Sequence, residues 1–425
     1  MYPLFESEYI YLKGRKQSKC LKTIDVESDI ISCLPDHLID LILSYLSIKE
    51  AVQTSVLSSK WRKKWSTLSD LVFDSQCVST VTSQDPSVIE SKFLRIVDHV
   101  LLLHSGPINK FEISANSFQN LTIGVNSMAD IDRWIFHISE RYIKELVLDI
   151  WLYQHYKIPW RLYSCQSLHH LKLKCCLLKP PTTFEGFKNL KSLVLNRVTM
   201  TQDAFENIIS GCPRLEKLTL MEMDDLWLKP PTTFEDFRNL KRLSLAWFKL
   251  TQDAVENMIS RCPVLEKLKL REIDGLWLKP PTTFEGFRNL KSLSLAWVKL
   301  TQDAFDNMIS GCPLLEKLTL ENINGLTQIN IHAPNLKSFD FYGEFERINF
   351  DDTFQLAMVS VVLISKSNQI GLHGCSSNLL KFFVHLPHIH NLFISTEFLK
   401  VSILLMLNSI VVATHLVQYK FPKPE

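Results

Sequence analysis

The sequence predicts an α/β protein in which a short N-terminal helical segment precedes a long solenoid built on a parallel sheet. Two observations predict this fold class. Residues 29–74 carry apolar residues at helical spacing, and from about Leu178 onward the sequence repeats itself with a period of 50 residues. A chain of 425 residues has room for both parts.

The segment 29–74 predicts three short helices. Pro35 suits a first helical position, and apolar residues recur around it at helical spacing, namely Leu34, Leu38, Leu41, Ile42, Tyr45 and Leu46. Ser47 and Glu50 have the spacing of a capping box, which predicts the start of a second helix. A third helix is expected to carry Trp61 and Trp65 one turn apart, within a basic run.

This helical segment is small for an independent domain. About 40 residues usually bury too little surface to be stable alone, and association with another polypeptide is one common remedy. The other interpretation is a helical cap on the repeats that follow.

The repeats show two periods. The octapeptide LKPPTTFE begins at Leu178, Leu228 and Leu278, and residues 228–277 share 38 of 50 positions with 278–327. The pattern L-x-x-L-x-L also recurs every 25 residues from Leu190 to Leu315, within the leucine-rich-repeat range. Weaker copies extend the array to about eleven to thirteen units. The weaker copies begin at Ile108, Ile143, Leu336, Leu356 and Ile389, and a further full copy of the pattern begins at Leu168.

Each unit predicts a short strand whose leucines point inward and whose intervening residues point outward. One unit cannot bury its leucines alone, so neighbours stack in parallel. Residues 201–211 predict a connecting helix with a threonine N-cap and a glycine end, repeated at Thr251 and Thr301. The diproline segments forbid a long helix, and their phenylalanines are expected to fill the core. The expected fold is a curved parallel sheet on the concave face, with helices and irregular turns on the convex face.

Composition excludes several function classes. The net charge of +2 gives no case for nucleic-acid binding. Cys212, Cys262 and Cys312 recur at one repeat position, and the remaining cysteines form neither a disulfide pattern nor a metal-ligand array, which favours buried thiols in a reducing compartment. The chain lacks a Gly-rich phosphate loop, H-E-x-x-H and G-x-S-x-G, so we expect no enzyme activity, cofactor or metal.

The two ends of the chain carry weaker signals. Residues 1–28 show no secretory signal and are expected to form a disordered tail, whose scattered lysines and arginine are either a nuclear signal or solvated surface. The only membrane candidate, Val401–Val417, contains polar residues and is more consistent with a buried strand or helix.

The order of residues in the helical segment carries a family resemblance. Leu34-Pro35-Asp36 opens a helix, Ile42 to Leu46 continues it, and Val56-Leu57-Ser58-Ser59-Lys60-Trp61-Arg62 follows. This order resembles the F-box of plant F-box/leucine-rich-repeat proteins, including those with a C-terminal FBD region. Lys60 stands where an arginine is common, and both are cationic.

The resemblance implies a partner and a role. In that family the F-box docks on a Skp1-like adaptor, which links it to a cullin-RING ubiquitin ligase in the nucleus or cytoplasm. The chain is then expected to be a non-catalytic substrate-recognition subunit of an SCF-type ligase, with repeats that bind a target protein. The docking positions carried over are Leu34, Pro35, Leu38, Ile42, Leu43, Val56, Leu57 and Trp61, although some of these must hold the helices together. The alternative is a leucine-rich-repeat scaffold acting outside the ubiquitin pathway.

The motif GCPxLEKLxL also resembles the repeats of this family. The expected domains are therefore an F-box at 29–74, a linker or solenoid cap at 75–104, and a solenoid at 105–395. Residues 396–425 are expected to form an atypical tail that departs from the FBD region.

The outward residues of the strands are the candidate target-binding surface, because such arrays usually bind on the concave face. They include a basic cluster of Lys217, Arg242, Lys267, Lys269, Arg271 and Lys317. The cluster suits an acidic or phosphorylated segment, and the alternative is a solvated face that keeps the sheet soluble. Trp247 and Trp297 follow these strands and are expected to pack as ridges.

Overall fold

The computed structural model describes residues 30–78, 85–114, 122–152, 156–223, 237–249, 261–274, 277–278, 287–326, 328–344, 347–363 and 389–394. The chain divides into two compact units, Met1–Cys212 (unit 1) and Pro213–Glu425 (unit 2). The expectations for residues 1–28, for Val401–Val417 and for the tail 396–425 lie outside the described residues. So does the repeat helix expected at Thr251.

The N-terminal segment contains three short α-helices, α1 (Ile30–Cys33), α2 (Asp36–Ser44) and α3 (Ile48–Gln53). The predicted capping box is confirmed. The backbone N–H of Glu50 donates to Ser47 Oγ at 3.3 Å, and the N–H of Ser47 donates to the Glu50 carboxylate at 3.0 Å.

The expected third helix is replaced by turns and two 3₁₀ helices, Thr54–Val56 and Lys64–Thr67. Trp61 lies in a turn and Trp65 in the second 3₁₀ helix. The hydroxyls of Thr54 and Ser66 each donate to a carbonyl three residues earlier, both at 2.7 Å. Such side-chain hydrogen bonds compete with regular helix propagation, which accounts for the difference.

Unit 1 contains a parallel sheet in which neighbouring strands follow the chain order: β1 (Asp70–Phe73), β2 (Lys110–Ser114), β4 (Glu145–Asp149), β7 (His170–Lys174) and β9 (Ser192–Asn196). The strands β2 and β4 confirm the weaker repeat copies at Ile108 and Ile143, and β7 confirms the full copy at Leu168. The first strand, β1, belongs to the segment predicted as purely helical. Its Leu71 and Phe73 are fully buried, so the helical segment continues directly into the solenoid sheet.

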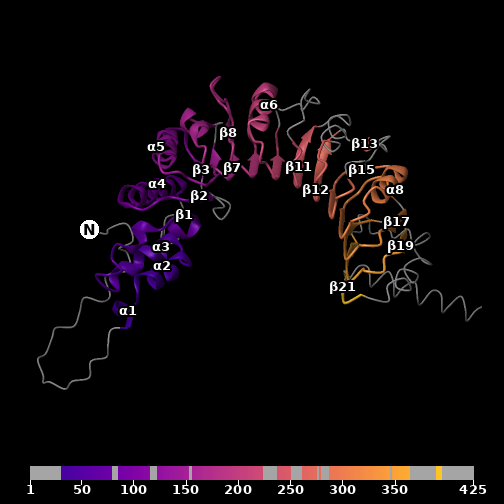
Figure 1. Cartoon of the computed structure of the whole chain (residues 1–425), viewed down its shortest axis with the longest axis horizontal. Helices are drawn as coiled ribbons and strands as arrows, with labels where there is room; N and C mark the ends of the chain where they lie inside the picture. The colour runs from indigo at the N-terminus through magenta and orange to yellow at the C-terminus, as the bar shows by residue number, and fades with distance from the viewer. Residues whose placement is uncertain are drawn as a thin grey trace, which may run out of the picture. The chain divides into compact units, whose positions relative to one another are not determined.

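The helices of unit 1 are α4 (Pro86–Leu103), α5 (Met128–Ser139) and α6 (Gln202–Ser210), and they lie outside the sheet strands in Figure 1. The predicted threonine cap is confirmed at α6, where Ala204 N donates to Thr201 Oγ1 at 3.2 Å. The segment expected as a linker or cap, 75–104, contains the 3₁₀ helix Ser75–Val78 and α4. Further 3₁₀ helices are Val125–Ser127 and Trp160–Ser164, and two short pairs join β3 (Thr122–Ile123) to β5 (Trp151–Leu152) and β6 (Tyr156–Lys157) to β8 (Cys176–Leu177).

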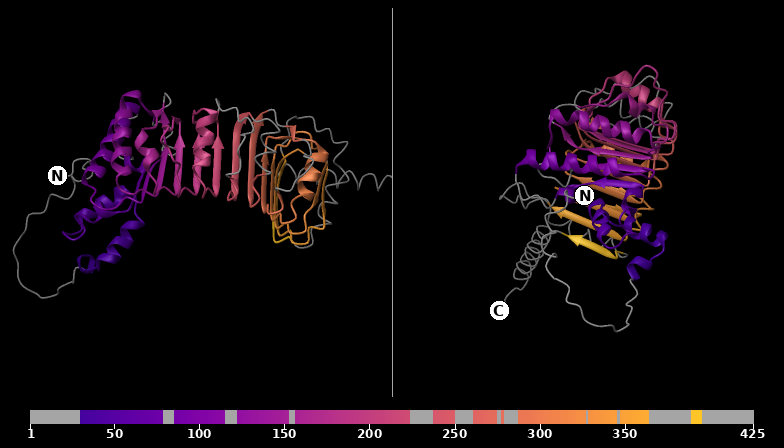
Figure 2. Two further views of the ribbon diagram at one scale, coloured as in Figure 1. Left: turned by 45° about the horizontal axis from the view of Figure 1, so that its top comes forward. Right: turned by 90° about the vertical axis from the view of Figure 1, so that its left-hand side faces the viewer.

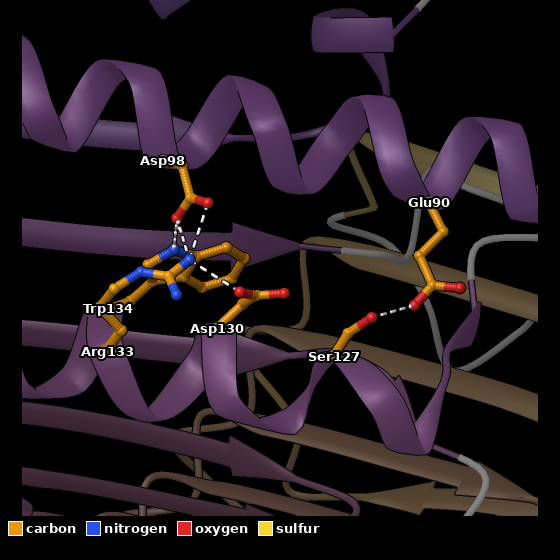
Figure 3. A network of polar contacts seen from close by, with 6 residues as sticks. All are labelled: Glu90, Asp98, Ser127, Asp130, Arg133 and Trp134. Atoms are coloured by element: carbon orange, nitrogen blue, oxygen red, sulfur yellow. Dashed lines mark hydrogen bonds and ion pairs between the residues drawn. The ribbon is translucent and has the colours of Figure 1, made fainter.

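A polar network joins α4 to α5 (Figure 3). Asp98 of α4 accepts from Trp134 Nε1 at 2.6 Å and from the guanidinium of Arg133 at 2.7 Å. Glu90, which lies nearer the start of α4, accepts a hydrogen bond from Ser127 Oγ at 2.7 Å. The hydrogen bond that Arg133 donates to Asp98, followed by the one that it donates to Asp130, raises the pKa of Arg133. The network therefore fixes the first two solenoid helices against each other.

Unit 2 contains a second series of parallel strands, in which each strand pairs with the next one along the chain. They are β10 (Lys217–Met221), β11 (Arg242–Lys249), β12 (Lys267–Asp274), β14 (Ser292–Ala296), β16 (Lys317–Glu321), β18 (Ser338–Gly343), β20 (Met358–Leu363) and β21 (Asn391–Ile394). The helix α8 (Gln302–Ser310) follows Thr301 as predicted. Short pairs join β13 (Trp277–Leu278) to β15 (Lys299–Leu300) and β17 (Gln328–His332) to β19 (Arg347–Asp351). Figure 2 shows the strands of each unit side by side.

The core of each unit is a ladder of aligned apolar side chains, most of them leucines. In unit 2 the register places Leu218, Leu243, Leu268, Leu293 and Leu318 on successive strands, and each is at most 2% exposed. Burying one such side chain stabilises the fold by about 1.5–3 kcal/mol. Phe184 and Phe187 of the first diproline segment also pack into the core, with ring centroids 5.0 Å apart.

Candidate functional site

The N-terminal helical segment, which was predicted to be an F-box, has a core of its own. Ile39 and Leu43 of α2 face inward, together with Ile48, Ala51 and Trp65. Trp61 is only 3% exposed, and its indole Nε1 donates to the carbonyl of Ile31 at 3.1 Å. These side chains hold the short helices together.

A set of large apolar side chains in the same segment is left exposed. Leu38, Leu41, Ile42 and Tyr45 stand at i, i+3, i+4 and i+7 of α2 and its C-cap, so they share one helix face. Val56 and Leu57 are exposed by 62% and 47% at the end of the first 3₁₀ helix. We call these six residues the apolar surface. Exposed apolar side chains are ordinary when scattered, but a shared helix face of them marks an interaction site.

The structure sorts the eight docking positions expected from the sequence. Four of them belong to the apolar surface, namely Leu38, Ile42, Val56 and Leu57. Pro35, which directly precedes α2, is exposed, and Leu34 is half-buried. Leu43 and Trp61 are corrected, because both are core residues that a partner cannot reach in the folded segment.

Two members of the apolar surface, Leu41 and Tyr45, were not among the docking positions predicted from the sequence. Leu41 and Tyr45 are exposed by 51% and 81%. Their signal was available in the sequence, since both continue the helical spacing of Leu38 and Ile42.

Lysines of the basic run form ion pairs with acidic residues of the same helical segment. Lys60 and Lys64 each lie 3.3 Å from Asp36, and Lys64 lies 3.3 Å from Asp40. Hydrogen bonds from Lys64 and then Lys60 lower the pKa of Asp36. Burial opposes the charge on Lys64, but its bonds to Asp36 and Asp40 outweigh this and raise the pKa of Lys64. These lysines therefore fasten the start of α2 rather than forming a nucleic-acid surface.

The F-box is attached to the repeats by backbone contacts within unit 1. The carbonyl of Ser66 accepts from the N–H groups of Ser105 at 2.8 Å and Gly106 at 3.2 Å. His104 Nε2 lies 2.7 Å from the Leu68 carbonyl, and burial lowers the pKa of this histidine. A Cβ on Gly106 would stand 2.8 Å from Thr67 Cα, so the approach is close. The F-box therefore has a defined orientation relative to the sheet of unit 1.

A second candidate surface lies on the sheet of unit 2, where the residues between the inward leucines project from the strands. We call this the open face. The register places Lys217, Arg242 and Lys267 on three neighbouring strands, and Lys269 follows on the same face of β12. The structure thus brings four residues of the predicted basic cluster together.

The other two residues of the basic cluster are neutralised. Arg271 lies 2.9 Å from Glu321, reaching past Ala296 on the strand between them, and its guanidinium stands 5.5 Å from the Trp247 ring centroid. Lys317 lies 2.9 Å from Asp340. Trp297 Nε1 also donates to Glu321 at 3.2 Å, so this tryptophan supports an ion pair as well as the ridge.

The described residues offer little that resembles a catalytic or membrane site. They hold no group of three histidine, cysteine or acidic side chains placed to bind a metal ion. His169 Nδ1 is engaged by the Ser167 carbonyl at 2.8 Å. Among the described helices, none combines the length and apolar character needed to cross a membrane.

A helical segment with an exposed apolar face, joined to parallel leucine-rich strands, is the arrangement expected of an F-box protein with leucine-rich repeats. Comparison with known families agrees. Residues 31–73 match the F-box domain, and residues 131–229 and 277–415 match the family "FBD-associated F-box protein At5g56370, LRR repeats". The second match covers more than half of the chain, and the chain belongs to this family. The predicted resemblance is confirmed.

Similar proteins come from Arabidopsis thaliana. F-box/FBD/LRR-repeat protein At1g13570 is 46% identical over 198 residues, which are 47% of this chain and 45% of that protein. F-box/FBD/LRR-repeat protein At3g52680 is 34% identical over 203 residues, and F-box/LRR-repeat protein At3g59200 is 31% identical over 206 residues. The matches cover 41% and 38% of those two proteins, so the chain aligns with less than half of each relative.

Proposed function

We propose that this chain is a substrate-recognition subunit of an SCF-type ubiquitin ligase, acting in the nucleus or cytoplasm. The F-box docks a Skp1-like adaptor, and through it a cullin-RING ligase, while the repeats bind a target protein. The chain makes and breaks no bonds itself. It raises the effective concentration of a target lysine near the ubiquitin-charged enzyme.

The apolar surface is the observation that carries this proposal. It leaves Leu38, Ile42 and Leu57 in water within a segment whose core is already filled by other side chains. Covering such side chains removes apolar area from water at about 25 cal/mol per Å², which favours a partner. The surface belongs to the segment that matches the F-box domain, and F-box domains generally bind Skp1 adaptors.

The attachment of the F-box also supports a receptor. Hydrogen bonds from Ser105 and Gly106 to Ser66 leave little freedom between the F-box and the first repeats. A rigid connection between the F-box and the repeats favours ubiquitin transfer, because a bound target must be held within reach of the ubiquitin-charged enzyme.

A leucine-rich-repeat scaffold outside the ubiquitin pathway remains the second candidate, since the open face could bind a partner in either case. The two candidates differ in adaptor binding. A scaffold needs no adaptor, and depleting it leaves the lifetime of its partner unaltered.

The test is co-purification of the full chain with a plant Skp1-like adaptor. The variant Ile42→Asp/Leu57→Asp places charges on the apolar surface and should abolish adaptor binding. Both side chains are exposed, so the circular dichroism spectrum and the thermal midpoint should stay near wild type. The matched control is Leu102→Asp on α4, where the leucine is 80% exposed outside the F-box.

Each outcome has a clear meaning. Loss of the adaptor in Ile42→Asp/Leu57→Asp, with binding retained in Leu102→Asp, supports the proposal. Failure of the wild-type chain to bind the adaptor, or full binding by the double variant, would refute it. Trp61→Ala is unsuitable for this test, because removing a core side chain is expected to unfold the segment.

A further inference from the structure

Four cations gather on the open face of unit 2. Lys217, Arg242 and Lys267 are register partners on β10, β11 and β12, and such strands lie about 4.8 Å apart. Lys269 lies two residues further along β12, about 6.6 Å from Lys267. Arg242, Lys267 and Lys269 are exposed, and Lys217 is half-exposed. We call these four residues the cationic patch.

Several other charges of unit 2 form ion pairs between neighbouring strand segments. Lys241, Lys291 and Lys337 lie 3.2–3.4 Å from glutamates of the preceding strand segment. Arg271 and Lys317 have carboxylate partners on the open face itself. Among the residues that the structure describes, no carboxylate forms an ion pair with a member of the cationic patch. Like charges on neighbouring strands repel, so the patch is better satisfied by an anion from outside.

The internal duplication shows that the strands do not require these charges. Residues 228–277 and 278–327 share 38 of 50 positions, yet three differences fall on the open face. Arg242, Lys269 and Arg271 correspond to Ser292, Thr319 and Glu321 in the later copy. That copy forms the same strands in the same register, so neutral residues are compatible with this scaffold. The positive charge is a property of the surface rather than a need of the fold.

We propose that the cationic patch binds a segment of the target protein with clustered negative charge, supplied by aspartate and glutamate or by a phosphorylated serine or threonine. The inference rests on the proposed function, since it names the chemistry that the receptor recognises. Lysine and arginine donate charge-assisted hydrogen bonds to both kinds of anion, and arginine can do so with two parallel bonds. Four cations in a chain of net charge +2 are too few for a nucleic-acid surface, which favours a peptide.

The test measures fluorescence anisotropy of labelled peptides with the full chain. The probes are a glutamate-rich peptide, a phosphoserine peptide and a glutamine-rich peptide of the same length. The variant Arg242→Ser/Lys269→Thr uses the residues that the later copy carries at these positions. We expect it to bind both acidic peptides about tenfold more weakly, because exposed ion pairs contribute up to about 1 kcal/mol each.

The control variant Lys291→Ser/Lys337→Ser removes the same net charge from two paired lysines outside the patch. It should bind the acidic peptides as the wild type does. Tighter binding of one acidic peptide identifies carboxylate or phosphate as the source of the charge, and either result supports the proposal.

Three results would overturn the inference. The wild-type chain could bind the acidic peptides no better than the glutamine-rich peptide, or the control could weaken as much as the patch variant. A single-stranded oligonucleotide could also displace the acidic peptides at lower concentration than they displace each other. Adaptor co-purification is measured on the same proteins. If the wild-type chain does not bind the adaptor, the proposed function is refuted, whereas the peptide measurement still decides whether the cationic patch binds acidic segments.

Discussion

Asp149 is a buried acid whose removal has a calculable consequence. It lies at the end of β4, only 2% exposed, with Lys172 at 2.6 Å and Lys174 at 3.2 Å. The Lys174 side chain is 5% exposed and its ammonium stands 4.0 Å from the Trp151 ring centroid. Burial raises the pKa of Asp149, but the hydrogen bond and charge of Lys172, followed by those of Lys174, outweigh burial and lower it.

The substitution Asp149→Asn keeps the shape of the side chain and removes its charge. Breaking a buried ion pair from one side typically costs 3–5 kcal/mol. We expect about 3 kcal/mol here, the low end, because the Lys172 side chain is 29% exposed and can turn toward water. Amide hydrogen exchange in β4 and β7 should then accelerate about a hundredfold, since it reports the free energy of local opening.

Acid should remove the same stabilisation from the wild-type chain. The pKa of Asp149 is lower in the folded state, so its contribution is present above the unfolded value of about 4 and is lost as pH falls through the folded value. The difference in exchange between the wild type and Asp149→Asn should therefore close in acid.

The control is Asp130→Asn, because Arg133 keeps its contact with Asp98 when Asp130 is changed. It should cost less than about 1 kcal/mol, as partly exposed pairs do. The variant Asp149→Asn/Lys174→Met removes both buried charges and should recover much of the loss. A cost below about 1 kcal/mol for Asp149→Asn, or a difference that persists unchanged in acid, would show that this pair does not stabilise unit 1.

Two further predictions concern close packing in the repeats. Gly186 has φ +97° and a Cβ there would stand 2.1 Å from the Gly211 carbonyl oxygen, so Gly186→Ala should destabilise unit 1 by more than about 1 kcal/mol, measured as a fall in the thermal midpoint. An unchanged midpoint would contradict this steric argument. Burial raises the pKa of three repeat thiols to about 12, those of Cys212, Cys262 and Cys312. Iodoacetamide should therefore label exposed Cys33 in the native chain and these three only after denaturation, and native labelling of the three at the rate of Cys33 would show that they are accessible.

Local patterns predicted much of the fold because their causes are local. The Ser47–Glu50 capping box and the Thr201 and Thr301 caps all form, since each involves residues within one helical turn. The 25-residue leucine period gives the strands of both units, because a strand with one buried face needs alternating apolar residues. The third F-box helix was predicted wrongly. Hydroxyl groups that bond to nearby carbonyls, as at Thr54, compete with the helix and leave the apolar spacing intact.

The roles of the surface residues depended on neighbours distant in the sequence. Ile42 and Leu43 are neighbours in the sequence and both were predicted docking positions, yet Ile42 is exposed and Leu43 is fully buried, because only Leu43 faces the core of the folded segment. Likewise, Lys269 and Arg271 are both cations at outward positions of the same strand, so the sequence does not distinguish them. Glu321 neutralises Arg271 from 50 residues away, whereas Lys269 keeps its charge on the open face.

The sequence by itself determined the class of the protein, its F-box and the repeat that builds its sheets, because periodicity and capping are carried by residues close along the chain. Only the tertiary structure decided which apolar side chains reach water and which charges lack a partner. Burial and ion pairing are properties of residues brought together from different strands and turns, and the register that aligns Lys217, Arg242 and Lys267 exists only in the assembled sheet.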